Sequence, residues 1–100
     1  MKHTATDSNG KTVSRKSKHA YTHVVVVNRT AESIAQCLTN IEEDRAGGQC
    51  SEKGLAYRLE TVTSPKVCGW SSRLELAEKV AVDARLEWAG RGIVEILTCA

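Results

Sequence analysis

The chain has 100 residues, of which 26% are charged, 41% are hydrophobic and only 4% are aromatic, with no phenylalanine. This length fits one compact domain, whose core must be built mainly from Val, Leu, Ile and Ala. The net charge of +2 excludes both the acidic proteins that mimic DNA and the very basic histone-like proteins.

The charge is distributed unevenly along the chain. Residues 1–29 contain six basic residues and a single acidic one, Asp7, for a net charge of +5, whereas residues 30–100 have a net charge of −3. The six basic residues are Lys2, Lys11, Arg15, Lys16, Lys18 and Arg29. The sequence therefore predicts a polarised molecule with its positive charge at one end.

No exported or membrane-spanning segment is predicted. Residues 1–17 lack the apolar stretch of a signal peptide, and the longest apolar run, Val24 to Val27, is far shorter than the roughly 18 residues of a membrane span. We therefore expect a cytoplasmic protein that makes no membrane contact. In a reducing compartment the cysteines are expected to be free thiols, although an even number also permits two disulfides. They are Cys37, Cys50, Cys68 and Cys99.

Residues 1–19 are polar and basic, and they surround a turn signal, Asp7-Ser8-Asn9-Gly10. Asn and Gly tolerate positive φ, and the threonines and Val13 on either side favour strands. The sequence predicts either a short β-hairpin or a disordered basic arm here, preceding a single domain over residues 20–100.

The strongest predicted strand spans Ala20 to Val27. Its four consecutive valines put apolar side chains on both faces, which is typical of a central strand that is covered on both sides. A helix is predicted next, with Thr30 as its N-cap and Gly47-Gly48 at its end. Its apolar stripe consists of Ile34, Cys37, Leu38 and Ile41, at i, i+3, i+4 and i+7.

The alternation of apolar and polar residues over Leu55 to Thr63 predicts a second strand. Ser64-Pro65 then makes a turn, and Lys66 to Trp70 is predicted to be a short edge strand that pairs with its predecessor.

The sequence Ser72-Arg73-Leu74-Glu75 predicts a capping box at the start of the longest helix, which runs to about Ala89. The packing face of this helix is predicted to comprise Leu74, Ala77, Ala81, Ala84 and Trp88. The last predicted strand, Ile93 to Thr98, is mostly apolar and is expected to be largely buried.

From Ala20 onward this order predicts an α+β fold with a ferredoxin-like split β-α-β sheet, in which two helices cover one face of four strands. The N-terminal hairpin would extend the sheet or fold over its open face. We therefore predict one α+β domain with a basic hairpin or arm attached.

No catalytic, metal-binding or cofactor-binding residues are predicted. His3, His19 and His23 have no carboxylate or cysteine at a spacing that local structure would bring into register, and the glycines match no phosphate-binding motif. Cys68, two residues after Lys66, is the one candidate for a reactive thiol.

The basic segment Arg15-Lys16-Ser17-Lys18-His19 is the main functional candidate. Permanent charges beside an aromatic residue are typical of surfaces that contact nucleic-acid phosphates, but they also attract acidic protein surfaces. Base stacking as in RNA-recognition motifs is weakly supported, because aromatic residues are scarce. The candidate partner-binding residues are Arg15, Lys16, Lys18, Tyr21 and Arg29.

Three runs of residues near the N-terminus carry a resemblance to a known class of proteins: Asp7-Ser8-Asn9-Gly10-Lys11, Arg15-Lys16-Ser17 and Tyr21-Thr22-His23-Val24-Val25. This stretch resembles the start of small proteins encoded on bacterial phages and other mobile elements, a class that includes inhibitors of CRISPR–Cas complexes. The resemblance implies a non-enzymatic protein in the host cytoplasm that occupies a surface on a host protein or ribonucleoprotein complex. The expected oligomeric state is a monomer or a homodimer, because an uncapped sheet edge and a helix of small residues would support a dimer. A small nucleic-acid-binding regulator is the alternative.

Overall fold

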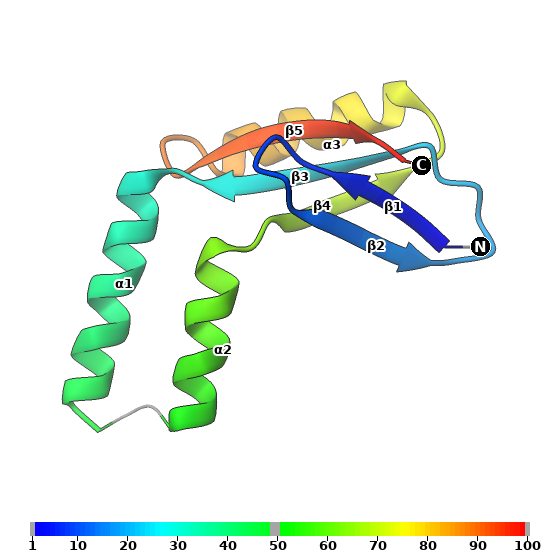
Figure 1. The fold of residues 1–100 in the computed structure, drawn as a ribbon. Coiled ribbons are helices and arrows are strands. Elements are labelled where there is room, and N and C mark those ends of the chain that lie inside the picture. The colour runs from blue at the N-terminus through cyan, green and yellow to red at the C-terminus, as the bar shows by residue number, and fades with distance from the viewer. Residues whose placement is uncertain (1, 49–50, 100) are drawn as a thin grey trace.

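A valine-rich strand, β3 (His23–Arg29), forms the middle of the main sheet (Figure 1). The structure, a computed structural model, describes residues 2–48 and 51–99. β3 pairs in antiparallel fashion with β4 (Lys66–Ser71) on one side and with β5 (Gly92–Thr98) on the other. The side chains of Val24, Val25, Val26 and Val27 are at most 2% exposed, so this central strand is covered on both faces, as predicted.

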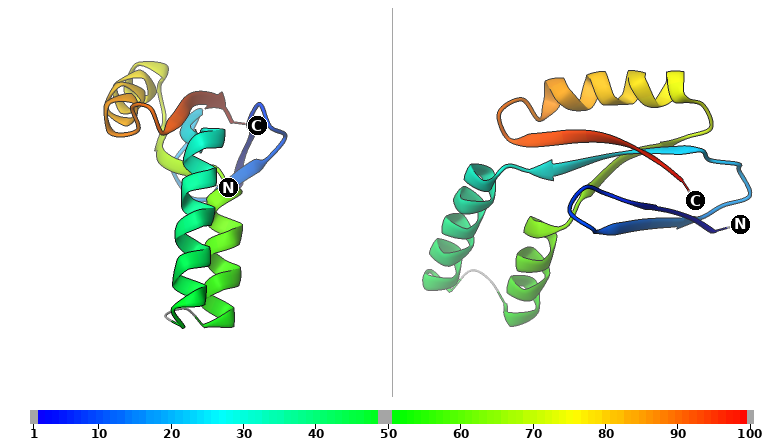
Figure 2. Two further views of the ribbon diagram at one scale, coloured as in Figure 1. Left: turned by 90° about the vertical axis from the view of Figure 1, so that its left-hand side faces the viewer. Right: turned by 45° about the horizontal axis from the view of Figure 1, so that its top comes forward.

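One face of the sheet is covered by α3 (Leu74–Glu87), as Figures 1 and 2 show. Ala77 and Ala81 are fully buried in the cluster that includes Val25. Small side chains at i and i+4 let the helix lie close to the strands. The predicted packing face is confirmed at its alanines and at Trp88, whereas Leu74 at its start is 48% exposed.

The opposite face is covered by a hairpin of β1 (Lys2–Thr6) and β2 (Thr12–Lys16). Its Ala5 and Val13 pack against Val24 and Val26 of β3. The predicted turn is confirmed, since Gly10 has a φ of 79°, in the region that glycine adopts readily. Of the two alternatives for residues 1–19, the hairpin is therefore the one that forms, and it folds over the sheet rather than extending it.

The other two helices form a separate antiparallel pair. α1 (Ala31–Ala46) begins after Thr30, whose side chain accepts a hydrogen bond from the backbone N–H of Ser33, so the predicted N-cap is confirmed. α2 (Glu52–Thr63) lies beside α1, and the pair projects from one end of the sheet (Figure 2). The molecule is consequently elongated, with extents of 46 × 29 × 20 Å.

The prediction of a strand over residues 55–63 is wrong, because these residues belong to α2. Ser51 caps this helix by accepting a hydrogen bond from the backbone N–H of Gly54. Ala56, Arg58 and Glu60, interpreted as one face of a strand, are all strong helix formers. The spacing of Leu55, Leu59 and Val62 fits a helix as well as the alternation fits a strand, and contact with α1 favours the helix.

This error changes the sheet. β4 is an edge strand as predicted, but it pairs with β3 rather than with residues 55–63. The α+β class is confirmed, whereas the main sheet has three strands in the order β4-β3-β5 instead of the four of the ferredoxin-like arrangement. Two helices were predicted on one face, and only α3 lies there, because α1 and α2 pack on each other.

The predicted capping box is also absent. α3 begins one residue later than expected, with Arg73 at the N-cap and no side-chain hydrogen bond to the helix there. Ser72 therefore lies outside the position from which its hydroxyl could cap the helix.

Three of the four cysteines, Cys37, Cys68 and Cys99, are free thiols as predicted, and Cys50 lies outside the described residues. Among the helices of the described ranges, none combines the length and apolar character that crossing a membrane requires.

Gly92 lets Trp88, just after α3, pack closely against β3. A Cβ added at Gly92 would lie 2.6 Å from Val27 Cγ2 and 3.2 Å from Trp88 Cε3. We expect Gly92→Ala to lower the free energy of unfolding by about 1–3 kcal/mol, because the core must shift to admit the methyl group. Chemical denaturation measures the change.

Gly69→Ala is the matched control, since Gly69 is also a strand glycine and its added Cβ would make an ordinary 3.4 Å contact with Val80 Cγ1. This variant is expected to be as stable as the wild type or more so, because alanine restricts the unfolded chain. Equal effects of the two substitutions would show that the space at Gly92 is not limiting.

Candidate functional site

The predicted basic segment forms a cationic surface on the hairpin. Lys16 on β2 lies directly opposite Lys2 on β1, so the two like charges share one side of the hairpin. Arg15 precedes Lys16 and therefore points to the other side of the hairpin, where it lies over Tyr21, and Lys18 is exposed in the connection to β3. We call Lys2, Arg15, Lys16 and Lys18 the hairpin surface. None of the four makes an ion pair with an acidic residue of the described chain, where both ion pairs lie on the α1–α2 pair.

Tyr21 lies at the centre of a ring cluster beneath this surface. Its ring centroid is 5.4 Å from that of His3, 5.8 Å from that of His19 and 6.1 Å from that of Trp70. The guanidinium of Arg15 lies 5.2 Å from the Tyr21 centroid. Tyr21 is therefore half-buried and covered by a cation, so it supports the hairpin surface rather than offering an open ring to a base.

Asp7, the one acidic residue among residues 1–29, does not neutralise the hairpin surface, because it is buried at the turn. Its carboxylate accepts hydrogen bonds from the backbone N–H groups of Asn9 and Lys11 and from the side chain of Asn28 on β3. Burial alone would raise the pKa of Asp7, but these hydrogen bonds and the charge of Lys11 outweigh it, so the pKa lies below its usual value. Asp7 thus joins the hairpin turn to the end of β3.

The lowered pKa of Asp7 makes its contribution to stability dependent on pH. Because the folded-state value lies below the unfolded one, the contribution is complete above about pH 4 and is lost as the pH falls further. We expect Asp7→Asn to be less stable than the wild type at pH 7, and the difference to shrink at more acidic pH. Thermal unfolding across this pH range measures the difference in stability between Asp7→Asn and the wild type, with Asp83→Asn as the control at an exposed carboxylate. A difference that stays constant with pH would count against this role of Asp7.

Arg29 does not join the other candidate residues. It lies at the far end of β3 from Tyr21, and a seven-residue strand spans roughly 20 Å. It also belongs to the sheet face that α3 covers, because it alternates with Val25 and Val27. The structure therefore brings Arg15 and Tyr21 into contact, places Lys16 on the same hairpin and Lys18 in the connection that follows it, and places Arg29 elsewhere.

At that end, Arg29 is one of three cations around a single indole ring. The guanidinium of Arg29 lies 4.9 Å from the Trp88 ring centroid, and Lys66 Nζ and the Arg91 guanidinium each lie 5.1 Å from it. No two of these charges are therefore more than about 10 Å apart. Within the described ranges, none of the three forms an ion pair with a carboxylate. Cation–π contacts with Trp88 offset part of their repulsion.

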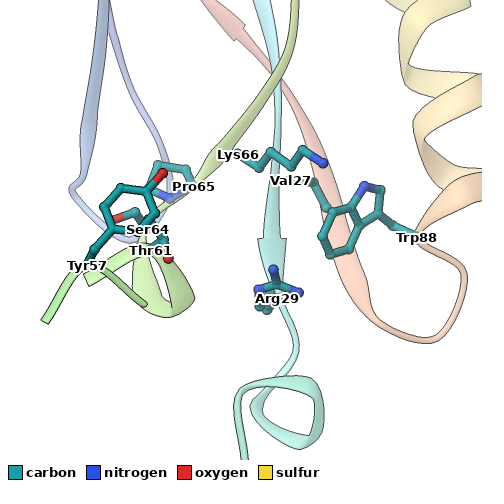
Figure 3. A pocket seen from close by; sticks show the side chains of 8 residues that line it. All are labelled: Val27, Arg29, Tyr57, Thr61, Ser64, Pro65, Lys66 and Trp88. Atoms are coloured by element: carbon teal, nitrogen blue, oxygen red, sulfur yellow. The ribbon is translucent and has the colours of Figure 1, made fainter. Parts of the chain in front are cut away.

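A cavity of about 390 Å³ opens beside this cluster. Figure 3 shows its two sides: β3, Lys66 of β4 and Trp88 on one, and the end of α2 with Tyr57 on the other. The lining residues are Val27, Arg29, Tyr57, Thr61, Ser64, Pro65, Lys66 and Trp88. Arg91 contacts Trp88 from outside the cavity, where its guanidinium donates a hydrogen bond to the carbonyl oxygen of Glu87. The cavity therefore lies between the end of the sheet, with Trp88, and the end of α2.

Sequence reasoning missed this cluster. Lys66 and Arg91 stand far from Arg29 in the chain, and only the strand register brings them together. Lys66 pairs with Val27 on one side of β3, and Gly92 pairs with Arg29 on the other. Trp88 was predicted as a packing residue, which it is at 5% exposure. No spacing within the sequence marks its second role as a platform for cations.

The candidate reactive thiol is not activated. Burial raises the pKa of Cys68 and Glu87 adds to the rise, while Lys66 opposes it without reversing it. Cys68 is therefore a protonated thiol at neutral pH, contrary to the suggestion from its neighbour in the sequence. In the described part of the chain, no group of three or more His, Cys, Asp and Glu side chains is arranged to hold a metal ion.

Comparisons of the chain with protein-family models, with curated proteins and with solved structures find no match.

Proposed function

We propose that this protein is a non-enzymatic interaction protein that binds a host nucleic-acid-handling complex, such as a CRISPR–Cas effector, through the hairpin surface and thereby inhibits it. The observation that carries the proposal is the uncompensated charge of Lys2, Arg15, Lys16 and Lys18. The hairpin is anchored by Asp7 and by the contact of Ser8 with Glu95, so these cations are presented on an ordered surface.

On the opposite face of the sheet, α3 contains four acidic residues, Glu75, Glu78, Asp83 and Glu87, against Lys79 and Arg85. The cations around Trp88 lie at one end of the same face. Positive charge on the hairpin raises the rate at which it meets a negatively charged partner. The hairpin face would meet a negatively charged region of the target, either an acidic protein surface or the phosphates of a bound nucleic acid.

The likeness of residues 7–25 to small phage and mobile-element proteins supports a target in the host cell. Such a protein needs no catalytic group, because occupying the surface of an assembly is sufficient to block it. The position of the hairpin over the sheet supports this mode of action, since it offers a broad surface rather than a deep cleft.

A second candidate is a regulator that binds nucleic acid directly. The placement of Lys2 opposite Lys16 favours it, because such a pair is unfavourable in the free protein and would be relieved by phosphate. If all four cations contact phosphates, the logarithm of the affinity should fall against the logarithm of salt concentration with a slope of about −3 to −4. Titration of a labelled oligonucleotide at several salt concentrations measures this slope.

Charge reversal tests the leading proposal. We expect the triple variant Arg15→Glu, Lys16→Glu, Lys18→Glu to lose binding to the host complex while the protein remains folded, because the mutated side chains are exposed. Affinity capture from a lysate of the native host, with and without nuclease, gives the readout. Capture that survives nuclease assigns the target to a protein, and capture that nuclease abolishes favours the second candidate.

The control must change the net charge equally. A second triple variant, Lys53→Glu, Arg73→Glu, Lys79→Glu, reverses three exposed cations that lie away from the hairpin. Lys53 and Arg73 lie at helix N-termini, where an acidic residue is favourable. This control variant should bind like the wild type. If the hairpin variant binds equally well, or the control is equally impaired, the hairpin surface is not the binding surface.

A further inference from the structure

We infer that the cavity beside Trp88 binds a nucleotide, with Arg29 and Lys66 holding its phosphate and Tyr57 contacting its base. This inference is independent of the proposed function, because none of the cations of the hairpin surface lines the cavity. It rests on the charge, the size and the two unlike walls of this site.

The charge calls for an anion. Arg29 and Lys66 line the cavity, Arg91 lies on the same indole ring, and none of them has an acidic partner within the ranges that the structure describes. Three like charges this close repel one another at ordinary ionic strength, because their separations are comparable to the screening length of about 8–10 Å. A phosphate placed between Arg29 and Lys66 would relieve this repulsion and accept charge-assisted hydrogen bonds from both.

Two carboxylates lie nearby, but within the described residues they form no ion pair with the three cations. Asp83 and Glu87 line a separate groove on the other side of Lys66, together with Cys68. Neither lines the cavity, and neither is within ion-pair distance of Lys66. Lys66 therefore lies between a groove that carries acidic groups and a cavity that carries none.

The opposite wall suits a base and a sugar rather than a second anion. Tyr57 is 68% exposed, and Figure 3 shows its ring across the cavity from Arg29 and Trp88. An exposed tyrosine offers a face on which a nucleobase can stack. Thr61 and Ser64 donate their hydroxyl hydrogens to backbone carbonyl oxygens of α2, so their oxygens remain as acceptors for hydroxyl or N–H groups of a ligand.

The size of the cavity agrees with this ligand class. At about 390 Å³ it lies at the lower end of the range for small-molecule sites. A single phosphate ion would leave most of this volume and the whole Tyr57 wall unused. A nucleoside monophosphate would place its phosphate against the cations and its base against Tyr57.

Calorimetric titration tests the inference with defined probes, namely the four common nucleoside monophosphates, adenosine, inorganic phosphate and a 5′-phosphorylated oligonucleotide. We expect at least one monophosphate to bind more tightly than inorganic phosphate, and adenosine to bind weakly or not at all. Lys66→Gln and Arg29→Gln should each weaken binding roughly tenfold, because each removes a charged contact to phosphate. Arg91→Gln should have a smaller effect, since Arg91 lies outside the cavity.

Tyr57→Ala should also weaken nucleotide binding roughly tenfold, whereas Tyr57→Phe should retain it, because stacking needs only the ring. Lys53→Gln, which removes one exposed cation elsewhere on α2, is the charge control and should have no effect. Fluorescence of Trp88 in a Trp70→Phe background, where it is the single tryptophan, should respond to the same titration and report binding at this cavity.

The outcomes separate clearly. If the phosphorylated oligonucleotide binds more tightly than any free nucleotide, and Lys66→Gln weakens both to the same extent, the ligand is the end of a nucleic acid. If the oligonucleotide and the free nucleotide bind with similar affinities, the ligand is a free nucleotide. The inference is overturned if no nucleotide binds, if inorganic phosphate binds as tightly as the nucleotides, or if Lys53→Gln matches Lys66→Gln. Reversal of Arg15, Lys16 and Lys18 should leave nucleotide binding intact, so failure of either proposal can be recognised separately.

Discussion

The burial of both faces of β3 is the constraint on which the rest of the structure depends. Four consecutive valines must be removed from water, and burying each such side chain contributes about 1.5–3 kcal/mol. One sheet face needs a cover for Val24 and Val26, which the β1–β2 hairpin supplies, and the other needs a cover for Val25 and Val27. The small face of α3 lies on Val25, while Val27 is enclosed by the close approach of Gly92 and Trp88. A polar, basic hairpin is thus held in an ordered position by a few apolar contacts, the buried Asp7 and the hydrogen bond of Ser8 to Glu95.

The same constraint separates the two basic regions. The hairpin surface lies over one face of the sheet, near the start of β3, and the Trp88 cluster lies on the other face, near its end. α3 is the one helix that covers this second face, and α1 and α2 pack on each other instead. The end of α2 forms one wall of the cavity (Figures 2 and 3). One strand therefore supports two cationic sites of different shape, one broad and exposed and the other a cavity with an aromatic wall.

Local signals in the sequence were sufficient for much of this fold. The valine run, the Thr30 cap and the Asp7 to Gly10 turn each predict an element that the structure contains, because each is a short-range preference. The alternation over residues 55–63 was ambiguous, since the same residues fit a helix, and only contact with α1 selects between them. The Trp88 cluster could not be predicted, because it depends on pairing Lys66 with Val27 and Gly92 with Arg29, which no local pattern encodes. For the same reason Arg29, grouped with the hairpin by its place in the chain, belongs with Trp88 in space.

The central claim is that the two basic regions bind different ligands independently, and mapping of backbone amide shifts by NMR tests it most directly. A heparin oligosaccharide serves as a probe for the polyanion surface, and the tightest nucleoside monophosphate serves for the cavity. The account predicts that the polyanion shifts the amides of residues 2 and 15–18, and that the nucleotide shifts those of residues 27–29, 57–64, 66 and 88–92. Each set should respond in the same way when the other ligand is present. Shifts of one common set by both ligands, or competition between them, would contradict it.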